Sequence, residues 1–165
     1  MQPARVYIGI GSNLDDPTHQ VRRAFEALTG ILASGCVARS PLYRTAPVGA
    51  PPGQPDYINA VAALDTGLTP AQLLMVLQAL ELAQGRTRTA RWGARTLDLD
   101  LLLYDQLTSD DPWLTLPHPR LHQRAFVLYP LYDIAPDLNI PGRGRLSELL
   151  ANCPPQPITR LDSAN

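Results

Sequence analysis

The segment of residues 97–104 places two acidic residues at the start of a strongly apolar run, and this pattern constrains the fold more than any other in the chain. It reads Leu-Asp-Leu-Asp-Leu-Leu-Leu-Tyr, which is typical of a buried β-strand. Residues two apart in a strand point to the same face, so Asp98 and Asp100 should project together, with Cβ atoms about 6–7 Å apart. Paired carboxylates in such a place need cations, and hard divalent metal ions are the usual ones.

A cationic loop is expected immediately before this strand. Residues 86–95 contain four arginines, a tryptophan and a glycine. Guanidinium groups bind phosphate oxygens as fork-shaped donors, so arginines beside carboxylate-held magnesium suggest a site for a polyphosphate. All 14 basic residues of the chain are arginine. The absence of lysine excludes a P-loop lysine, a Schiff-base lysine and a lysine general base.

Length, charge and cysteine content restrict the class of protein. At 165 residues, we expect one domain spanning residues 1–165. The formal net charge of −1 argues against a general nucleic-acid binder. Two cysteines are too few for a disulfide framework. There is no signal-peptide core and no apolar run of about 20 residues, so we expect a cytoplasmic protein that does not bind membranes.

Hydrophobic periodicity predicts the order strand, helix, strand, strand, helix, strand. The expected strands are residues 6–10, 34–43, 57–64 and 98–104, and the expected helices start at Asp16-Pro17 and Thr69-Pro70 and stop at Gly30 and Gly85. This order indicates an α+β, ferredoxin-like fold, with a mostly antiparallel sheet and helices on one face. Additional helices and short strands are expected toward the C-terminus. These are an extended piece at 113–116, a helix from residue 124 that is kinked or stopped near Pro130, a helix at 146–151 and a frayed tail.

Several polar and aromatic residues have both a structural and a functional interpretation from pattern alone. Residues 45–55 form a proline- and glycine-rich stretch, typical of a functional lid or a disordered connection. Asn59 follows it on a largely apolar strand face and is either a satisfied core amide or a ligand contact. Spacing alone favours an ordinary solvated helix face for Gln78 and Glu81. Core packing is the alternative interpretation of the aromatic residues Tyr57, Trp92 and Phe126.

Five motifs in order resemble those of the 6-hydroxymethyl-7,8-dihydropterin pyrophosphokinase family of folate biosynthesis. The most specific is Arg91-Trp92-Gly93-Ala94-Arg95-Thr96-Leu97-Asp98-Leu99-Asp100-Leu101-Leu102. The others are Gly11-Ser12-Asn13-Leu14, then Tyr43-Arg44-Thr45 with Tyr57-Ile58-Asn59, Gly85-Arg86-Thr87-Arg88, and Pro117-His118-Pro119-Arg120 with Arg124-Ala125-Phe126. The resemblance covers nearly the whole chain. It implies transfer of pyrophosphate from ATP to the hydroxymethyl group of the pterin, leaving AMP.

The resemblance also implies a role for particular residues. Two Mg²⁺ ions would be held by Asp98 and Asp100, and Arg86 and Arg95 would be the catalytic phosphate clamps. The residues implied for ATP binding are Gln78, Glu81, Arg88, His118 and Arg124. Those implied for pterin binding are Thr45, Val48, Tyr57, Asn59, Trp92 and Phe126. The implied partners are small-molecule substrates, with no nucleic acid and no membrane, and we expect a monomer.

Two other functions are compatible with parts of the sequence. Another magnesium-dependent phosphoryl or nucleotidyl transferase would keep the paired aspartates but has no need for Tyr57, Asn59 and Phe126. The nucleotide product distinguishes it, because AMP indicates pyrophosphoryl transfer. A non-catalytic nucleic-acid-binding module of ferredoxin-like shape predicts exposed aromatic residues on the sheet and a basic face, and the sequence shows neither clearly.

Overall fold

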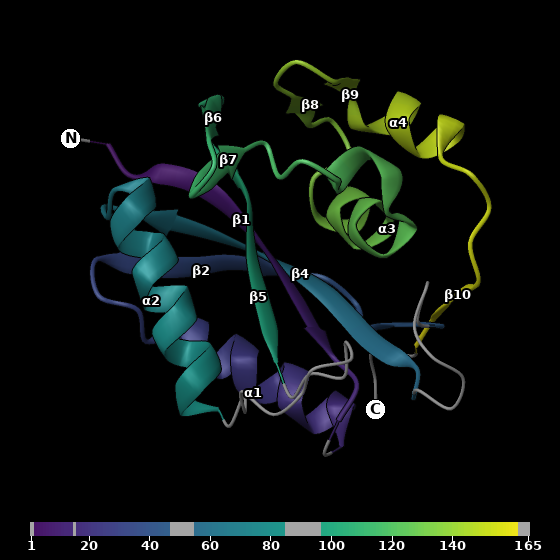
Figure 1. The fold of residues 1–165 in the computed structure, drawn as a ribbon, viewed down its shortest axis with the longest axis horizontal. Coiled ribbons are helices and arrows are strands. Elements are labelled where there is room, and N and C mark those ends of the chain that lie inside the picture. Colours follow the sequence, from purple (N-terminus) through teal and green to yellow (C-terminus); the bar gives the residue numbers. More distant parts are fainter. Residues whose placement is uncertain (1, 15, 47–54, 85–96, 162–165) are drawn as a thin grey trace.

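An antiparallel sheet forms the centre of the molecule (Figure 1). The computed structural model describes residues 2–14, 16–46, 55–84 and 97–161. Within them the sheet contains β1 (Ala4–Ser12), β2 (Ser34–Arg39), β3 (Tyr43–Thr45), β4 (Tyr57–Thr66), β5 (Asp98–Tyr104) and β10 (Ile158–Arg160). The strand order is β10-β3-β4-β1-β5, and β2 also pairs with β4. This arrangement confirms the α+β, ferredoxin-like prediction.

The expected second strand is divided into two strands. β2 ends at Arg39 and β3 begins at Tyr43, and Pro41 between them has no N–H to give to a sheet. Ser40 keeps this junction attached to β4, because its backbone N–H donates to the carbonyl of Val61 at 2.9 Å. The Val61 N–H in turn donates to the Ser40 hydroxyl at 2.8 Å. β2 and β3 therefore pair with the same strand, β4, on either side of the break.

Two helices, α1 (Pro17–Thr29) and α2 (Pro70–Ala83), pack on one face of the sheet. Each begins where the sequence predicts, with Asp16 and Thr69 as N-caps followed by proline. Thr69 and Gln72 form a reciprocal capping box, which satisfies two otherwise unpaired backbone donors. The buried residues of α1 and α2 share one core with the inward side chains of β1 and β4.

The C-terminal helices α3 (Ala125–Ile134) and α4 (Leu146–Asn152) cover the opposite face. The sequence pattern does not indicate which face these two helices cover. β4 explains why the second face is covered, because eight of its ten residues are buried. A strand apolar on both sides needs a layer on each side. α3 does not stop at Pro130, which lies inside the helix. Leu128 and Leu131, on either side of that proline, are fully buried, and their burial maintains the helix through it.

Short elements complete the described part of the chain. They are β6 (Ser109–Asp111) with β7 (Leu114–Leu116), a 3-10 turn at Leu121–Gln123, and β8 (Asn139–Ile140) with β9 (Gly144–Arg145). β7 and α4 confirm the predicted extended piece and the predicted short helix. β10 was not predicted, because residues 158–160 were expected to belong to a frayed tail. No helix in the described ranges is long and apolar enough to cross a lipid bilayer.

Candidate active site

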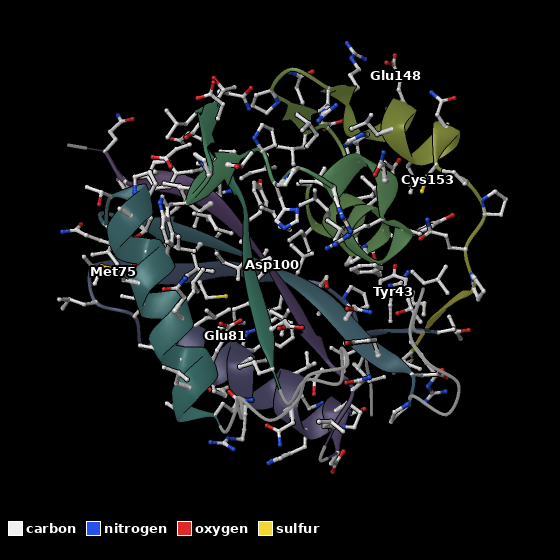
Figure 2. The ribbon with its side chains drawn as sticks, in the orientation of Figure 1. Tyr43, Met75, Glu81, Asp100, Glu148 and Cys153 are labelled. Atoms are coloured by element: carbon white, nitrogen blue, oxygen red, sulfur yellow. The ribbon has the colours of Figure 1, made fainter. Side chains whose placement is uncertain are left out.

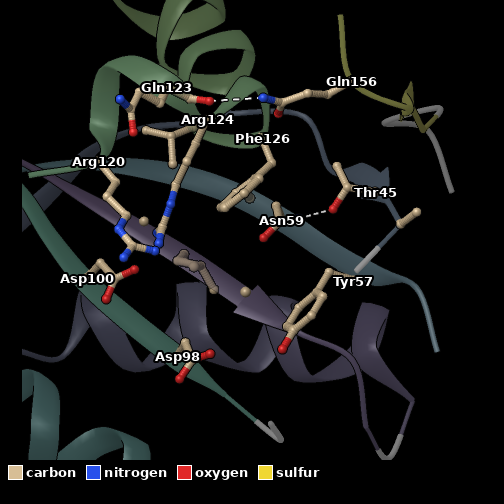
Figure 3. Close-up of a pocket in the computed structure, with 16 residues that line it drawn as sticks. Thr45, Tyr57, Asn59, Asp98, Asp100, Arg120, Gln123, Arg124, Phe126 and Gln156 are labelled. Atoms are coloured by element: carbon tan, nitrogen blue, oxygen red, sulfur yellow. Dashed lines mark hydrogen bonds between the residues drawn. The ribbon is translucent and has the colours of Figure 1, made fainter. Parts of the chain in front are cut away.

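A cavity of about 460 Å³ opens on the α3 side of the sheet (Figure 3). Its floor comes from β1, β4 and β5, and its wall comes from the start of α3 and the segment before it. The polar and aromatic residues that line it are Thr45, Tyr57, Asn59, Asp98, Asp100, Arg120, Gln123, Arg124, Phe126 and Gln156. The fold therefore gathers residues that are separated by more than 100 positions in the sequence.

Two carboxylates lie at one end of the cavity, on the first and third residues of β5. Asp98 and Asp100 are both partly buried and both line the cavity, as their alternation predicts. Their neighbours across the sheet are glycines, because Gly11 pairs with Asp98 and Gly9 pairs with Asp100. A glycine has no side chain to fill the space beside a carboxylate. The pairing leaves room for a ligand above the sheet.

Cationic groups face these carboxylates from the segment before α3. Arg120 and Arg124 both point toward Asp100 (Figure 3). Burial lowers the pKa of Arg124, while Asp100 acts in the opposite direction and Arg120 lowers it further. Burial also lowers the pKa of His118, against the opposing effect of Asp100 and together with Arg124 and Arg120. Repulsion between the two arginines is relieved when an anion binds between them.

Four of the residues predicted for pterin binding lie together at the other end of the cavity, which are Thr45, Tyr57, Asn59 and Phe126. Asn59 is only 5% exposed, and its Nδ2 donates to the Thr45 hydroxyl at 2.8 Å. That bond fixes the orientation of the amide. Tyr57 on β4 and Phe126 at the start of α3 both line the opening (Figure 3), and the Arg124 guanidinium lies 5.3 Å from the centroid of the Phe126 ring.

Gln78 and Glu81 are not among the residues that line the cavity, and their contact with ATP stays a prediction. Gln78 is exposed on α2. Glu81 is 6% exposed and lies between α2 and β5 (Figure 2). Its carboxylate accepts from the backbone N–H of Leu99 at 2.7 Å. β5 is an edge strand of the sheet, so this N–H faces away from β1 and needs another acceptor. Glu81 supplies this acceptor at Leu99, the residue between Asp98 and Asp100.

Other predicted residues cannot be placed, and some residues of the site were not predicted. Val48, Arg86, Arg88, Trp92 and Arg95 lie outside the described residues, and their roles stay predictions. The sequence analysis assigned no individual role to three polar residues that line the cavity, which are Arg120, Gln123 and Gln156. Arg120 lies within a quoted motif and Gln123 directly precedes another, so the motifs could have indicated both residues. Gln156 carries no such signal.

Comparison with known proteins assigns the chain to a family. The model of the 7,8-dihydro-6-hydroxymethylpterin-pyrophosphokinase (HPPK) family matches residues 7–136. The chain belongs to this family. A Pseudomonas aeruginosa protein, 2-amino-4-hydroxy-6-hydroxymethyldihydropteridine pyrophosphokinase, is 52% identical over 160 residues, covering 97% of this chain and 98% of that protein. A Haemophilus influenzae protein of the same name is 45% identical over 144 residues, covering 87% and 89%.

Solved structures agree on the fold. A crystal structure of HPPK-DHPS in complex with substrates matches with a TM-score of 0.71 at 11% identity, over 92% of this chain and 43% of that chain. A Plasmodium falciparum HPPK-DHPS structure with pterin and p-hydrobenzoate gives 0.71 at 12% identity, over 90% and 44%. The chain thus spans less than half the length of these solved chains. At such identities the likeness concerns the HPPK-like fold alone.

The number of acidic residues in the site restricts how it could bind magnesium. The described ranges contain no group of three or more histidine, cysteine or acidic residues that could hold a metal ion. Asp98 and Asp100 form a pair only. Mg²⁺ is commonly bound by one or two carboxylates, with waters and substrate phosphates completing an octahedron. The donor set therefore fits magnesium that is shared with a polyphosphate and does not fit a closed protein cage.

Proposed function

We propose that this chain transfers pyrophosphate from ATP to the hydroxymethyl group of 6-hydroxymethyl-7,8-dihydropterin, in folate biosynthesis. The hydroxymethyl oxygen bonds to the β-phosphorus of ATP, the bond from that phosphorus to the α–β bridging oxygen breaks, and AMP leaves. The observation that carries the proposal is one cavity with two different ends. Paired carboxylates with facing arginines lie at one end, and Asn59 with two aromatic rings lies at the other. Membership of the family and the names of the relatives support the same reaction.

The aromatic end suits a flat, polar heterocycle. Tyr57 and Phe126 offer ring faces for stacking on the pterin. Asn59 carries both a donor and an acceptor, and Thr45 already holds one of its amide hydrogens. The amide therefore meets the pterin edge in a fixed orientation, and little ordering is needed when the substrate binds.

The charged end suits the phosphates of ATP. Asp98 and Asp100 would hold two Mg²⁺ ions, which when bound offset the phosphate charge and align the reacting groups. Arg120 and Arg124 line the same space and would donate to phosphate oxygens, and His118 lies close to Asp100 and to both arginines. In this proposal Arg86, Arg88 and Arg95 add further donors from the arginine-rich loop, and Trp92 helps to seal the site. These four assignments rest on the sequence alone.

We assign Glu81 to positioning rather than to direct contact with the nucleotide. Its bond to the Leu99 N–H fixes the backbone at the residue between the two aspartates. A shift of β5 at this point moves both carboxylates together, and catalytic geometry tolerates little displacement. For Gln78 the structure gives no corresponding bond to the site.

A product assay tests the proposed reaction directly. The protein is incubated with Mg²⁺, ATP and 6-hydroxymethyl-7,8-dihydropterin, and nucleotides are separated by chromatography. We expect AMP in a one-to-one ratio with the pterin diphosphate, and no AMP when the pterin or Mg²⁺ is omitted. Formation of ADP, or of free pyrophosphate with a nucleotidyl adduct, would contradict pyrophosphoryl transfer.

The proposal also includes the state of the enzyme. We propose that residues 1–165 act as one domain, as a monomer, with ATP and the pterin as their partners. Light scattering during gel filtration at micromolar concentration measures this, and the expected mass is that of one 18.0 kDa chain. A mass of twice that value, unchanged on dilution, would contradict the monomer.

A further inference from the structure

Gln156 reaches the active-site cavity from a segment near the C-terminus. Its Oε1 accepts from the backbone N–H of Ala125 at 3.0 Å, and its Nε2 donates to the carbonyl of Gln123 at 2.9 Å (Figure 3). These two backbone groups lie immediately before and after Arg124. One side chain therefore holds the chain on both sides of a residue whose guanidinium faces Asp100.

Arg124, the residue between these two hydrogen bonds, occupies a helix position at which arginine is unusual. Arg124 is the N-cap of α3, and its side chain makes no capping hydrogen bond. The first N–H groups of a helix have no partner within the helix, and serine, threonine, aspartate or asparagine usually accept from them. Arginine has no acceptor atom. Gln156 supplies an acceptor from elsewhere in the chain, and the Arg124 side chain is left to extend into the cavity.

The segment that carries Gln156 is itself anchored. Prolines at 154, 155 and 157 flank the residue and restrict its backbone. Immediately after them, β10 pairs with β3, with Ile158 opposite Thr45. The Leu161 N–H then donates to the Leu42 carbonyl at 2.8 Å. Gln156 is thus held between a stiff segment and a strand of the central sheet.

We propose that Gln156 is a positioning residue for ATP binding, acting through Arg124. This inference rests on the proposed function, and it concerns a residue outside the range matched by the family model, which ends at residue 136. Gln156 replaces the missing cap of α3 and fixes the peptide groups on both sides of Arg124. The guanidinium is then presented to the phosphates without an ordering cost at the moment of binding.

Steady-state kinetics with Gln156→Ala and Gln156→Met tests this role. Both variants remove the two hydrogen bonds, and methionine retains the length of the side chain in case alanine impairs folding. We expect the KM for ATP to rise about tenfold, as the loss of two backbone hydrogen bonds implies, and kcat to fall less than about threefold. An unchanged KM for ATP in both variants would overturn the proposal.

A double-mutant cycle shows whether the effect passes through Arg124. In an Arg124→Ala background, Gln156→Ala should raise the KM for ATP by less than about twofold, because the group that it positions is gone. In an Asn59→Ala background the tenfold effect should persist. Equal effects in the wild-type and Arg124→Ala backgrounds would indicate a general structural role and would overturn the proposal.

Gln106 provides a matched control. Its Nε2 also donates to a distant backbone carbonyl, that of Asn139, at 3.2 Å, but Gln106 does not line the cavity. Gln106→Ala removes a comparable bond, and we expect no change in the KM for either substrate.

Hydrogen exchange separates failure of this inference from failure of the proposed function. The amide of Ala125 should exchange at least about tenfold faster in both Gln156 variants, since it loses its acceptor. This readout needs no turnover. If the wild-type chain formed no AMP, the proposed function would fail while exchange at Ala125 still decided whether Gln156 holds this backbone. Unchanged exchange would overturn the inference.

Discussion

The space for substrate in this site depends on two glycines of β1 that pair with the aspartates of β5. Gly9 and Gly11 lie across from Asp100 and Asp98, and both line the cavity. A Cβ built on Gly11 would lie 2.9 Å from Asn59 Oδ1, whereas one built on Gly9 would lie 3.4 Å from the nearest atom, the Leu102 Cδ2. A side chain at Gly11 would therefore displace Asn59, whereas one at Gly9 would only contact Leu102.

We predict that Gly11→Ala raises the KM for the pterin. Asn59 cannot retreat freely, because Thr45 holds its amide, and overpacking typically costs about 1–3 kcal/mol, or about 5- to 150-fold in affinity. Gly9→Ala is the control, since the flexible Leu102 side chain can adjust. A similar KM for the pterin in wild type and Gly11→Ala would show that the orientation of Asn59 does not matter.

The two aspartates should be essential for turnover but not for folding. We predict that Asp98→Ala and Asp100→Ala each reduce AMP formation by at least about 10³-fold, as expected when a metal ligand or transition-state charge partner is removed. Circular dichroism should show a folded protein. Asp110→Ala, which removes an exposed carboxylate on β6, controls for charge. Turnover near the wild-type rate in either site variant would contradict the two-metal assignment.

At the scale of elements, single side chains fix how neighbouring segments meet at the site. Glu81 joins α2 to β5, and Tyr43 joins β3 to α3 through Asp133. Burial first, and then Asp133, raises the pKa of Tyr43, so its hydroxyl stays protonated and donates to the carboxylate. Each bond reaches between layers of the fold that the sheet ladder does not connect.

Loss of the α2–β5 bond should reduce both stability and activity. Glu81→Ala leaves the buried Leu99 N–H without this acceptor, which costs about 1–3 kcal/mol of unfolding free energy. Because Leu99 lies between the aspartates, kcat should fall as well. Glu81→Gln keeps an acceptor oxygen and should retain most of both quantities. Met75→Ala, at an exposed position of α2, is the control for urea unfolding and AMP formation.

Loss of the β3–α3 bond should lower stability more than activity. Tyr43→Phe removes the hydroxyl that donates to Asp133 and should cost about 1–2 kcal/mol, which lowers Tm by about 2–8 °C in a protein of this size. Tyr132→Phe is the control, because Tyr132 is an exposed tyrosine of α3, the helix that contains Asp133. It should alter Tm by less than about 1 °C. Equal effects of the two substitutions would contradict a specific role for the Tyr43 hydroxyl.

At the scale of the whole molecule, the layer around α3 contains a partly buried histidine that should make stability depend on pH. His122 Nδ1 is buried and has no hydrogen-bond partner within the described ranges. Burial lowers the pKa of His122, and Arg143 lowers it further. The folded state therefore binds the proton less readily than the unfolded state.

The sign of this effect follows from the direction of the shift. Above a pH of about 6.5, the ordinary pKa of histidine, the contribution to stability is fully present. As pH falls below that value, the unfolded state gains a proton first, and stability is lost until the folded pKa is passed. We predict a falling Tm of magnesium-free protein between pH 7.5 and 5.5, less steep in His122→Gln than in wild type. His19→Gln, at an exposed position on α1, should leave the slope unchanged.

The sequence by itself determined the elements and the chemistry that is local to them. Caps at Asp16 and Thr69, the alternation in β5 and the order of strands and helices depend on spacing and short-range bonding, which a sequence displays directly. The family motifs added the residues of the two ends of the cavity. The sequence therefore predicts one site that contains Asp98, Asp100, Tyr57 and Asn59.

The tertiary structure alone decided which distant groups meet. Glu81, which the family resemblance implies for ATP binding, holds the Leu99 N–H, because α2 packs against an edge strand whose backbone needs an acceptor. Gln156 lies more than 30 positions beyond Arg124 and has no periodicity or motif to reveal it. Its part in the site arises only when β10 joins β3, since long-range pairings of this kind leave no local pattern in the chain.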